Sequence, residues 1–182
     1  MSQRLAVGDV FLIPLEGTVA TVGQIVSTYL SAYFLATFDE ITETDSPLVD
    51  RPLASPVVFI ALALDAKLAL GHWPIVARRP VADDIPLPAF KESVGSSERI
   101  RVVDHSGTRH RPATPKEAGI LRNRTIIAPA VLERAVRARL GLEPWLDAFD
   151  ELIPDRACTT DRLFRAAEGR HGQARPGVGR VS

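Results

Sequence analysis

Acidic side chains are concentrated between Asp39 and Asp50, ahead of the next basic residue, Arg51. The five carboxylates belong to Asp39, Glu40, Glu43, Asp45 and Asp50. Pro47 and Pro52 interrupt any regular pattern here, so residues 40–55 are predicted to form a surface loop. Two interpretations stay open. The loop is either simply solvated, or it is an anionic docking surface whose charge speeds association with a basic partner and selects that partner.

Residues suited to catalysis do not combine into a recognisable active site. The single cysteine, Cys158, has only His171 near it in sequence, and a catalytic thiol needs a fixed environment that lowers its pKa. His105 and His110 flank a turn that also contains Asp104, but a structural zinc ion needs four ligands. No glycine-rich phosphate-binding motif occurs in the sequence. We therefore predict a protein that is not an enzyme, with no catalytic residues, no metal site and no cofactor.

Composition limits the class of protein further. The 182 residues are 46% hydrophobic and 24% charged, which is typical of a folded globular chain. The net charge of zero offers no general reason to expect a nucleic-acid partner. The N-terminus lacks the pattern of a secretory signal, and the apolar stretch 56–70 is too short to cross a bilayer. A cytoplasmic location without a membrane partner is the expectation.

The elements that must position the acidic segment are predicted to be strands. Residues 7–39 contain three β-branched and aromatic runs separated by turn residues, which is typical of three consecutive antiparallel strands. Pro14 must lie at a strand end or edge, and Gly23 indicates a bulge or a close approach. Residues 57–64 are predicted to form a buried strand. Residues 72–78 are predicted to form an edge strand with Trp73 as a core anchor.

The second half of the chain is predicted to contain a hairpin and then helices. Residues 100–111 read as a hairpin whose turn needs a positive φ at Gly107. A capping box over Thr114–Glu117 predicts a short helix, and Pro129 and Pro144 each predict the start of another. Beyond Pro154 the chain becomes polar and basic. A helical turn or two is predicted over 161–168, followed by disorder from about Gly169.

Together these elements predict an α+β fold. Its centre is a small, strongly bent antiparallel sheet of the SH3-like barrel type, covered on one side by the C-terminal helices. Residues 1–153 are predicted to form a single globular β-rich domain. Residues 154–182 are predicted to form a loosely held basic tail that is partly disordered.

Several short segments occur in an order that is similar to one known family. They are Gly8-Asp9-Val10-Phe11 with Ile13-Pro14-Leu15, Gly23-Gln24-Ile25-Val26, residues 34–39, Trp73-Pro74-Ile75-Val76, and Pro86-Leu87-Pro88 before Phe90. Over residues 7–153 the chain resembles the immunity protein 26 family of bacterial polymorphic toxin systems. This resemblance implies an antitoxin that binds and neutralises a cognate toxin domain. A basic nuclease is one candidate for that toxin, because the acidic segment suits a basic partner. It assigns no functional residues, and it leaves the oligomeric state open.

Two other functions stay open as alternatives. The Gly8-Asp9-Val10 opening also resembles the PemK/Kid ribonuclease toxins, whose second strand is followed by an Arg-Pro pair similar to Arg51-Pro52. Here that pair follows a long acidic segment, which would repel phosphate. A non-enzymatic barrel adaptor for peptide or nucleic acid would need an exposed aromatic groove, whereas the aromatic residues of this chain are predicted to be mostly internal.

Overall fold

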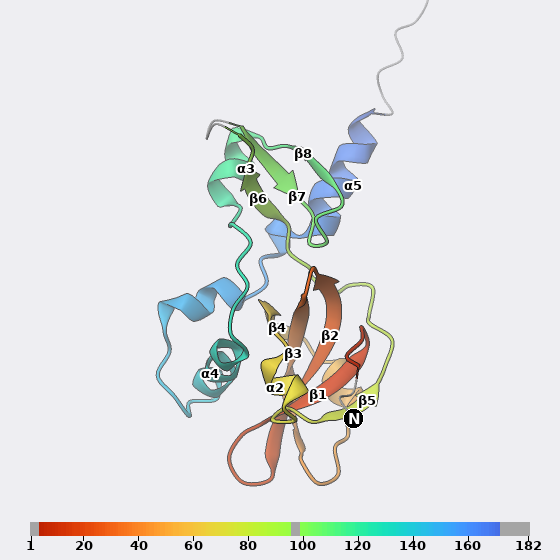
Figure 1. Ribbon diagram of the computed structural model, residues 1–182, viewed down its shortest axis with the longest axis vertical. Helices are drawn as coiled ribbons and strands as arrows, with labels where there is room; N and C mark the ends of the chain where they lie inside the picture. Colours follow the sequence, from red (N-terminus) through yellow and green to blue (C-terminus); the bar gives the residue numbers. More distant parts are fainter. Residues whose placement is uncertain (1–3, 96–98, 172–182) are drawn as a thin grey trace, which may run out of the picture. The chain divides into compact units, whose positions relative to one another are not determined.

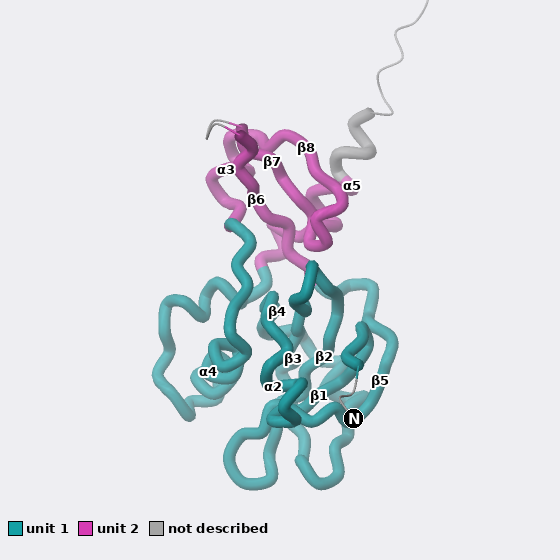
Figure 2. Tube along the Cα trace, viewed as in Figure 1, with its two compact units in different colours: residues 1–85, 123–154 teal, residues 86–122, 155–182 magenta. Residues whose placement is uncertain are grey.

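The computed structural model describes residues 4–95 and 99–171, which fold into two compact units (Figure 2). Unit 1 is formed by residues 1–85 and 123–154, and unit 2 by residues 86–122 and 155–182. Two compact units of one chain can still unfold in a single cooperative transition. The predicted single domain over 1–153, with a tail over 154–182, therefore stays a prediction.

Unit 1 contains an antiparallel sheet of five strands in the spatial order β4-β3-β2-β1-β5 (Figure 1). The strands are β1 (Asp9–Pro14), β2 (Val19–Tyr29), β3 (Ala32–Glu43), β4 (Val57–Ala63) and β5 (Ile75–Arg78). The three consecutive strands predicted in residues 7–39 are confirmed, and so is the α+β class. β4 and β5 are the two edges of the sheet, so the sheet is not closed into a barrel.

Pro14 and Gly23 have the positions that their chemistry predicts. Pro14 is the last residue of β1. A Cβ atom on Gly23 would lie 2.4 Å from the ring of Phe11, and the pairing of β2 with β3 shifts register between Thr21 and Gly23. Gly23 is therefore both the site of a bulge and the site of a close approach.

The core of unit 1 is centred on aromatic side chains that meet helix α4 (Pro129–Arg139). Trp73 is 1% exposed and stacks on Phe11, with ring centroids 5.4 Å apart. Its Nε1 donates to a carboxylate oxygen of Glu133 in α4, at 3.0 Å. Trp73 is thus confirmed as a core anchor, and α4 begins at Pro129 as predicted.

Short helical segments complete unit 1. α1 (Asp50–Leu53) and α2 (Ala66–Ala69) flank β4 in sequence. The helix predicted to begin at Pro144 is instead the 3-10 helix η1, which begins at Asp147 and ends at Leu152. Phe149 and Leu152 of η1 join the same core as α4. The prediction that C-terminal helical segments cover the sheet is confirmed for α4 and η1.

Unit 2 is built on a three-stranded antiparallel sheet in the order β6-β7-β8. These strands are β6 (Phe90–Ser93), β7 (Ile100–Val103) and β8 (His110–Pro112). The predicted hairpin is confirmed, with Gly107 at a φ of 79°. The predicted capping box is also confirmed, because Thr114 and Glu117 cap each other at the start of α3 (Pro115–Ile120).

The last described helix is α5 (Thr160–His171), which follows the 3-10 helix η2 (Arg156–Cys158). The predicted helical turns over 161–168 are confirmed, and Phe164 is buried in the core of unit 2 with Val102 and Leu121. The disorder predicted from about Gly169 is wrong for residues 169–171, which belong to α5, and the rest of it falls on residues 172–182, which lie outside the described residues.

Candidate partner-binding site

The acidic segment 39–50 is more ordered than the loop that its composition predicts. β3 continues through Asp39 and Glu40 to Glu43, and Asp50 opens the helical turn α1. The predicted loop over residues 40–55 is therefore wrong at both ends. The physical reason is the partner strand: β2 begins at Val19, which is opposite Glu43, and so supplies a hydrogen-bonding ladder to the polar end of β3.

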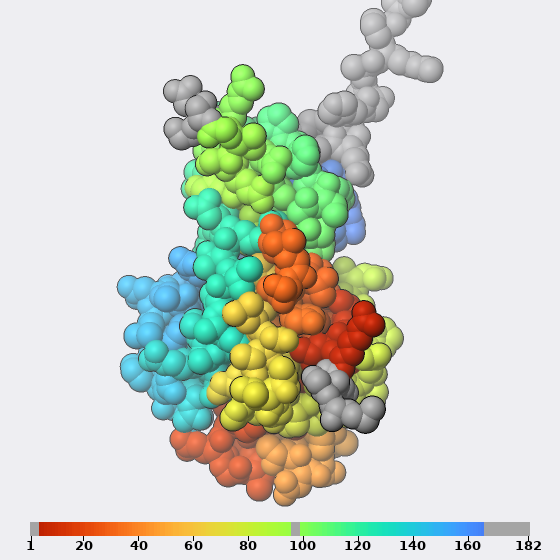
Figure 3. All heavy atoms as spheres, in the orientation of Figure 1, coloured from red at the N-terminus to blue at the C-terminus, as the bar shows by residue number. Residues whose placement is uncertain are grey.

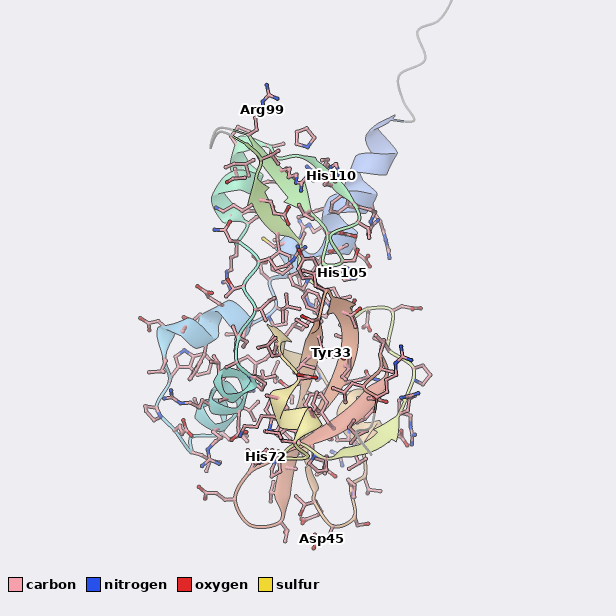
Figure 4. All side chains as sticks on the ribbon, viewed as in Figure 1. Tyr33, Asp45, His72, Arg99, His105 and His110 are labelled. Atoms are coloured by element: carbon pink, nitrogen blue, oxygen red, sulfur yellow. The ribbon has the colours of Figure 1, made fainter. Side chains whose placement is uncertain are left out.

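The end of β3 presents two different faces because strand side chains alternate. Asp39, Ile41 and Glu43 are exposed on one face, while Glu40 and Thr42 are half-buried on the other. The chain that follows turns at the surface of unit 1 (orange in Figure 3), and Asp45 lies near the tip of this turn (Figure 4). The five carboxylates thus occupy one continuous stretch of strand, turn and helix, but they do not all face the same way.

Arginines bind three of these carboxylates, and two of these arginines come from distant segments of the chain. Arg139 donates to Asp39 and Arg79 donates to Asp50, each at 2.6 Å, and Arg51 binds Glu40 at 2.7 Å. The hydrogen bond from Arg79 lowers the pKa of Asp50 below its ordinary value, so this carboxyl is charged at neutral pH. The surface is therefore a network of alternating charges. Sequence reasoning missed Arg79 and Arg139, since no local pattern links them to the acidic segment.

The other two acidic residues have hydroxyl neighbours. An oxygen of Glu43 accepts a hydrogen bond from the Thr18 hydroxyl at 2.7 Å, and an oxygen of Asp45 accepts one from Thr44 at 3.4 Å. A hydroxyl satisfies a lone pair without neutralising the charge. Glu43 and Asp45 are consequently the part of the segment with the most uncompensated negative charge.

Two large apolar side chains lie within this acidic surface. Ile41 is 51% exposed and Leu48 is 76% exposed. The backbone N–H of Leu48 donates to the Thr42 hydroxyl at 3.0 Å, which holds the turn against the end of β3. Exposed apolar side chains surrounded by charged groups are typical of a surface that binds another protein.

Cys158, His105 and His110, the residues considered for catalysis, belong to unit 2. Burial and the neighbouring Asp155 raise the pKa of the Cys158 thiol to about 11, which makes it a poor nucleophile. His105 and His110 are well separated in Figure 4, and a ring nitrogen of His105 lies 3.3 Å from the Thr160 hydroxyl. Within residues 4–95 and 99–171, no group of three or more potential ligands could hold a metal ion.

The Gly8-Asp9 opening of the chain has a structural purpose. The carboxylate of Asp9 is buried, accepts from the backbone N–H of Ala6 at 2.8 Å, and accepts from Arg78 at 2.7 Å. Gly8 has a φ of 93°, and a Cβ atom there would lie 2.7 Å from the Arg79 carbonyl oxygen. This motif fastens β1 to β5, so it carries information about the fold and not about a reaction.

Fold and site together define an α+β protein with an exposed charged surface suited to recognition. A family model described as immunity protein 26 matches residues 6–99, which is more than half of the chain. The chain belongs to the immunity protein 26 family. The match covers β1 to β6 and ends before β7. No curated protein and no solved structure matches the chain.

Among the described residues, no helix has the length and apolar character needed to span a membrane.

Proposed function

We propose that this chain is a cytoplasmic immunity protein of a bacterial polymorphic toxin system, which binds a cognate toxin domain and blocks it. The observation that carries this proposal is the membership in the immunity protein 26 family over residues 6–99. An antidote of this kind works by binding, so it needs a recognition surface and no catalytic group. A curvature of the SH3-like type for the five-stranded sheet is part of the same proposal.

The acidic segment 39–50 is the surface that we propose for toxin binding. Protein interfaces combine a desolvated apolar centre with a charged rim. Ile41 and Leu48 are suited to the centre, while Glu43 and Asp45 are suited to the rim. A toxin domain with a basic surface, such as a nuclease, is the complementary partner. A stable interface of about 1,600 Å² also needs neighbouring parts of unit 1.

The arginines that bind these carboxylates do not prevent such an interaction. Arg51, for example, is 85% exposed, and exposed ion pairs contribute only about 0–1 kcal/mol each. Basic groups of a toxin can therefore replace Arg51 on Glu40 or Arg139 on Asp39 at little cost. The released guanidinium groups are then available to carboxylates at the edge of the partner.

The first experiment expresses this chain alone in bacteria and follows growth and total RNA. We expect normal growth and intact RNA, because an antidote harms nothing without its toxin. Arrested growth with cleaved RNA would contradict the proposal and support the PemK/Kid-like ribonuclease alternative instead. Arg51→Ala is then the variant that decides whether the arginine is involved in the cleavage.

The second experiment identifies the toxin and tests neutralisation. The full chain serves as bait, and each captured protein is then expressed with and without the chain. We expect a captured protein that arrests growth alone and is harmless when both are present. A failure of every captured toxic protein to be neutralised would reject the antidote function. Neutralisation that persists when Asp39, Glu40, Glu43 and Asp45 become amides would reject only the proposed surface.

A further inference from the structure

Charge is divided unequally between the two units of this neutral chain. The residues of unit 2 include 13 Lys and Arg against 7 Asp and Glu, whereas those of unit 1 include 9 against 15. The family match ends at Arg99, so β7, β8, α3 and α5 lie beyond it. Unit 2 therefore has an excess of basic residues, and most of it lies beyond the family match. A basic surface attracts acidic partners.

Unit 2 contains an open groove of about 570 Å³ between the ends of its strands and the start of α3. Its floor is apolar and includes Val94 directly after β6, Ile100 from β7, Pro112 at the end of β8 and Pro115 at the start of α3. Val94 is 43% exposed, so part of this apolar surface faces water. Binding sites typically combine such a floor with a few polar groups that set orientation.

Basic side chains supply those polar groups. The groove is lined by Arg99, Arg101, Arg111 and His110, and Figure 4 shows Arg99 and His110 on the outside of unit 2. Two of the arginines have carboxylate partners: Arg111 binds Glu117 through bonds of 2.7 and 2.8 Å, and Arg101 binds Glu92 at 2.9 Å. Arg99 forms no ion pair with any of the described residues. Arg111 is thus held by Glu117, whereas the exposed Arg99 has no carboxylate partner among the described residues.

We propose that this groove binds an extended peptide segment of a partner protein in which Asp or Glu stands beside an apolar side chain. The guanidinium groups of Arg99 and Arg101 bind the carboxylate, while Val94 and Ile100 contact the apolar side chain. Clusters of arginines recognise acidic motifs in this way. This inference is independent of the toxin proposal, because it uses a different unit and a partner of opposite charge.

Two features favour side-chain recognition of a peptide over other modes. Pro112 has no backbone N–H to donate, so an added strand cannot continue along the edge strand β8 as in β-augmentation. Among the described residues that line the groove, none is Phe, Tyr or Trp. Single-stranded nucleic acids are usually held by stacking on such side chains, so charge alone does not make this a nucleic-acid site.

The test selects random eight-residue peptides displayed on phage against the full chain, and measures the affinity of the enriched peptides by fluorescence anisotropy. The groove variant is Arg99→Glu with Arg101→Glu. The matched control is Arg156→Glu with Arg165→Glu, which changes the charge of unit 2 equally at exposed positions outside the groove. Arg99→Gln is the mildest variant, because it breaks no ion pair among the described residues. Circular dichroism verifies that each variant is folded.

We expect the enriched peptides to combine Asp or Glu with Leu, Ile or Val. Their affinity should fall about ten-fold or more in the groove variant and measurably in Arg99→Gln, because charge-assisted hydrogen bonds to the peptide carboxylate are lost. The control should bind within about two-fold of the original chain. Enrichment without acidic residues, or equal binding to the groove variant, would overturn the proposal. If a labelled 12-nucleotide oligouridine binds more tightly than the peptides and loses affinity in the groove variant, the ligand is a nucleic acid and the peptide proposal is overturned.

Discussion

Close packing around single residues is most evident at Gly23 in β2. The nearest ring atoms of Phe11 leave no space for a Cβ atom, and Phe11 cannot retreat because it stacks on the buried Trp73. Cores of this density respond to the addition of a single methyl group. Gly23 is therefore required for the stacking of Phe11 on Trp73, although glycine usually destabilises a strand.

Gly23→Ala should lower the free energy of unfolding by about 1–3 kcal/mol, because the added methyl group collides with the Phe11 ring. Urea denaturation followed by tryptophan fluorescence measures this change, since both tryptophans lie in unit 1. As a control, the same substitution in a Phe11→Leu background should cost less, because the smaller side chain makes room. Equal costs in both backgrounds would show that the Phe11 contact is not the cause.

Ile41 and Leu48 are the exposed apolar residues that we place at the centre of the toxin interface. Ile41→Ser with Leu48→Ser should speed dissociation of the toxin complex about ten-fold or more, because a few buried apolar anchors supply most of the binding energy. Surface plasmon resonance measures the dissociation rate. Leu70→Ser is the matched control, since Leu70 is 73% exposed in unit 1 but lies outside the acidic segment. An unchanged dissociation rate in the double variant would remove Ile41 and Leu48 from the interface.

Among the elements, α3 shows how a local sequence signal gains strength from tertiary contacts. Thr114 and Glu117 form the capping box that the sequence predicts, and Arg111 of β8 adds two hydrogen bonds to the same carboxylate. The bonds from Arg111 and Thr114 lower the pKa of Glu117 to about 2, against an ordinary value near 4.5. The helix start is thereby fastened to the hairpin that borders the groove.

The folded-state pKa of Glu117 is depressed, so its contribution to stability is present above about pH 4.5 and is lost as the pH falls toward about 2. Glu117→Gln should lower the free energy of unfolding at pH 7 by about 1–2 kcal/mol, a value reduced by solvent screening. The difference should shrink in urea titrations, followed by circular dichroism, between pH 5 and pH 3. Lys116→Gln, at the exposed neighbouring position, should show no such pH dependence. A constant deficit at all pH values would mean that packing, not charge, is responsible.

The whole molecule has no net charge, yet its two units have opposite excess charges. Long-range steering depends on the local field that a partner meets, so a neutral total does not prevent rapid association. We expect the acidic unit to attract a basic toxin surface and the groove of unit 2 to attract acidic segments. The proposed partners can therefore be distinguished by the sign of their charge.

Replacing Asp39, Glu40, Glu43 and Asp45 with amides should slow toxin association about ten-fold at low salt and flatten its dependence on NaCl. Stopped-flow measurements between 50 and 500 mM NaCl test this expectation. The control replaces the same number of exposed carboxylates elsewhere in unit 1, at Asp83, Asp84, Asp147 and Glu151. If both variants slow association equally, the general charge of unit 1 is responsible and not the acidic segment.

The sequence by itself determined the elements whose signals are local. Turn residues and alternating apolar runs predicted β1 to β3, Gly107 predicted the hairpin turn, and Thr114 with Glu117 predicted the start of α3. Such signals are readable because backbone geometry and capping depend on residues only a few positions apart. The resemblance to the immunity protein 26 family was likewise readable, since the segments that carry it lie in order from β1 to the start of β6.

Only the tertiary structure decided which charges meet and which segments pack together. Arg139 binds Asp39, which is 100 residues away in sequence. The pairing of β2 with β3 extends the strand through polar residues as far as Glu43. Residues 86–122 fold with residues 155–171 into a basic unit, although the whole chain is neutral. These outcomes depend on contacts between distant segments, and such contacts leave no periodic or local pattern in a single sequence.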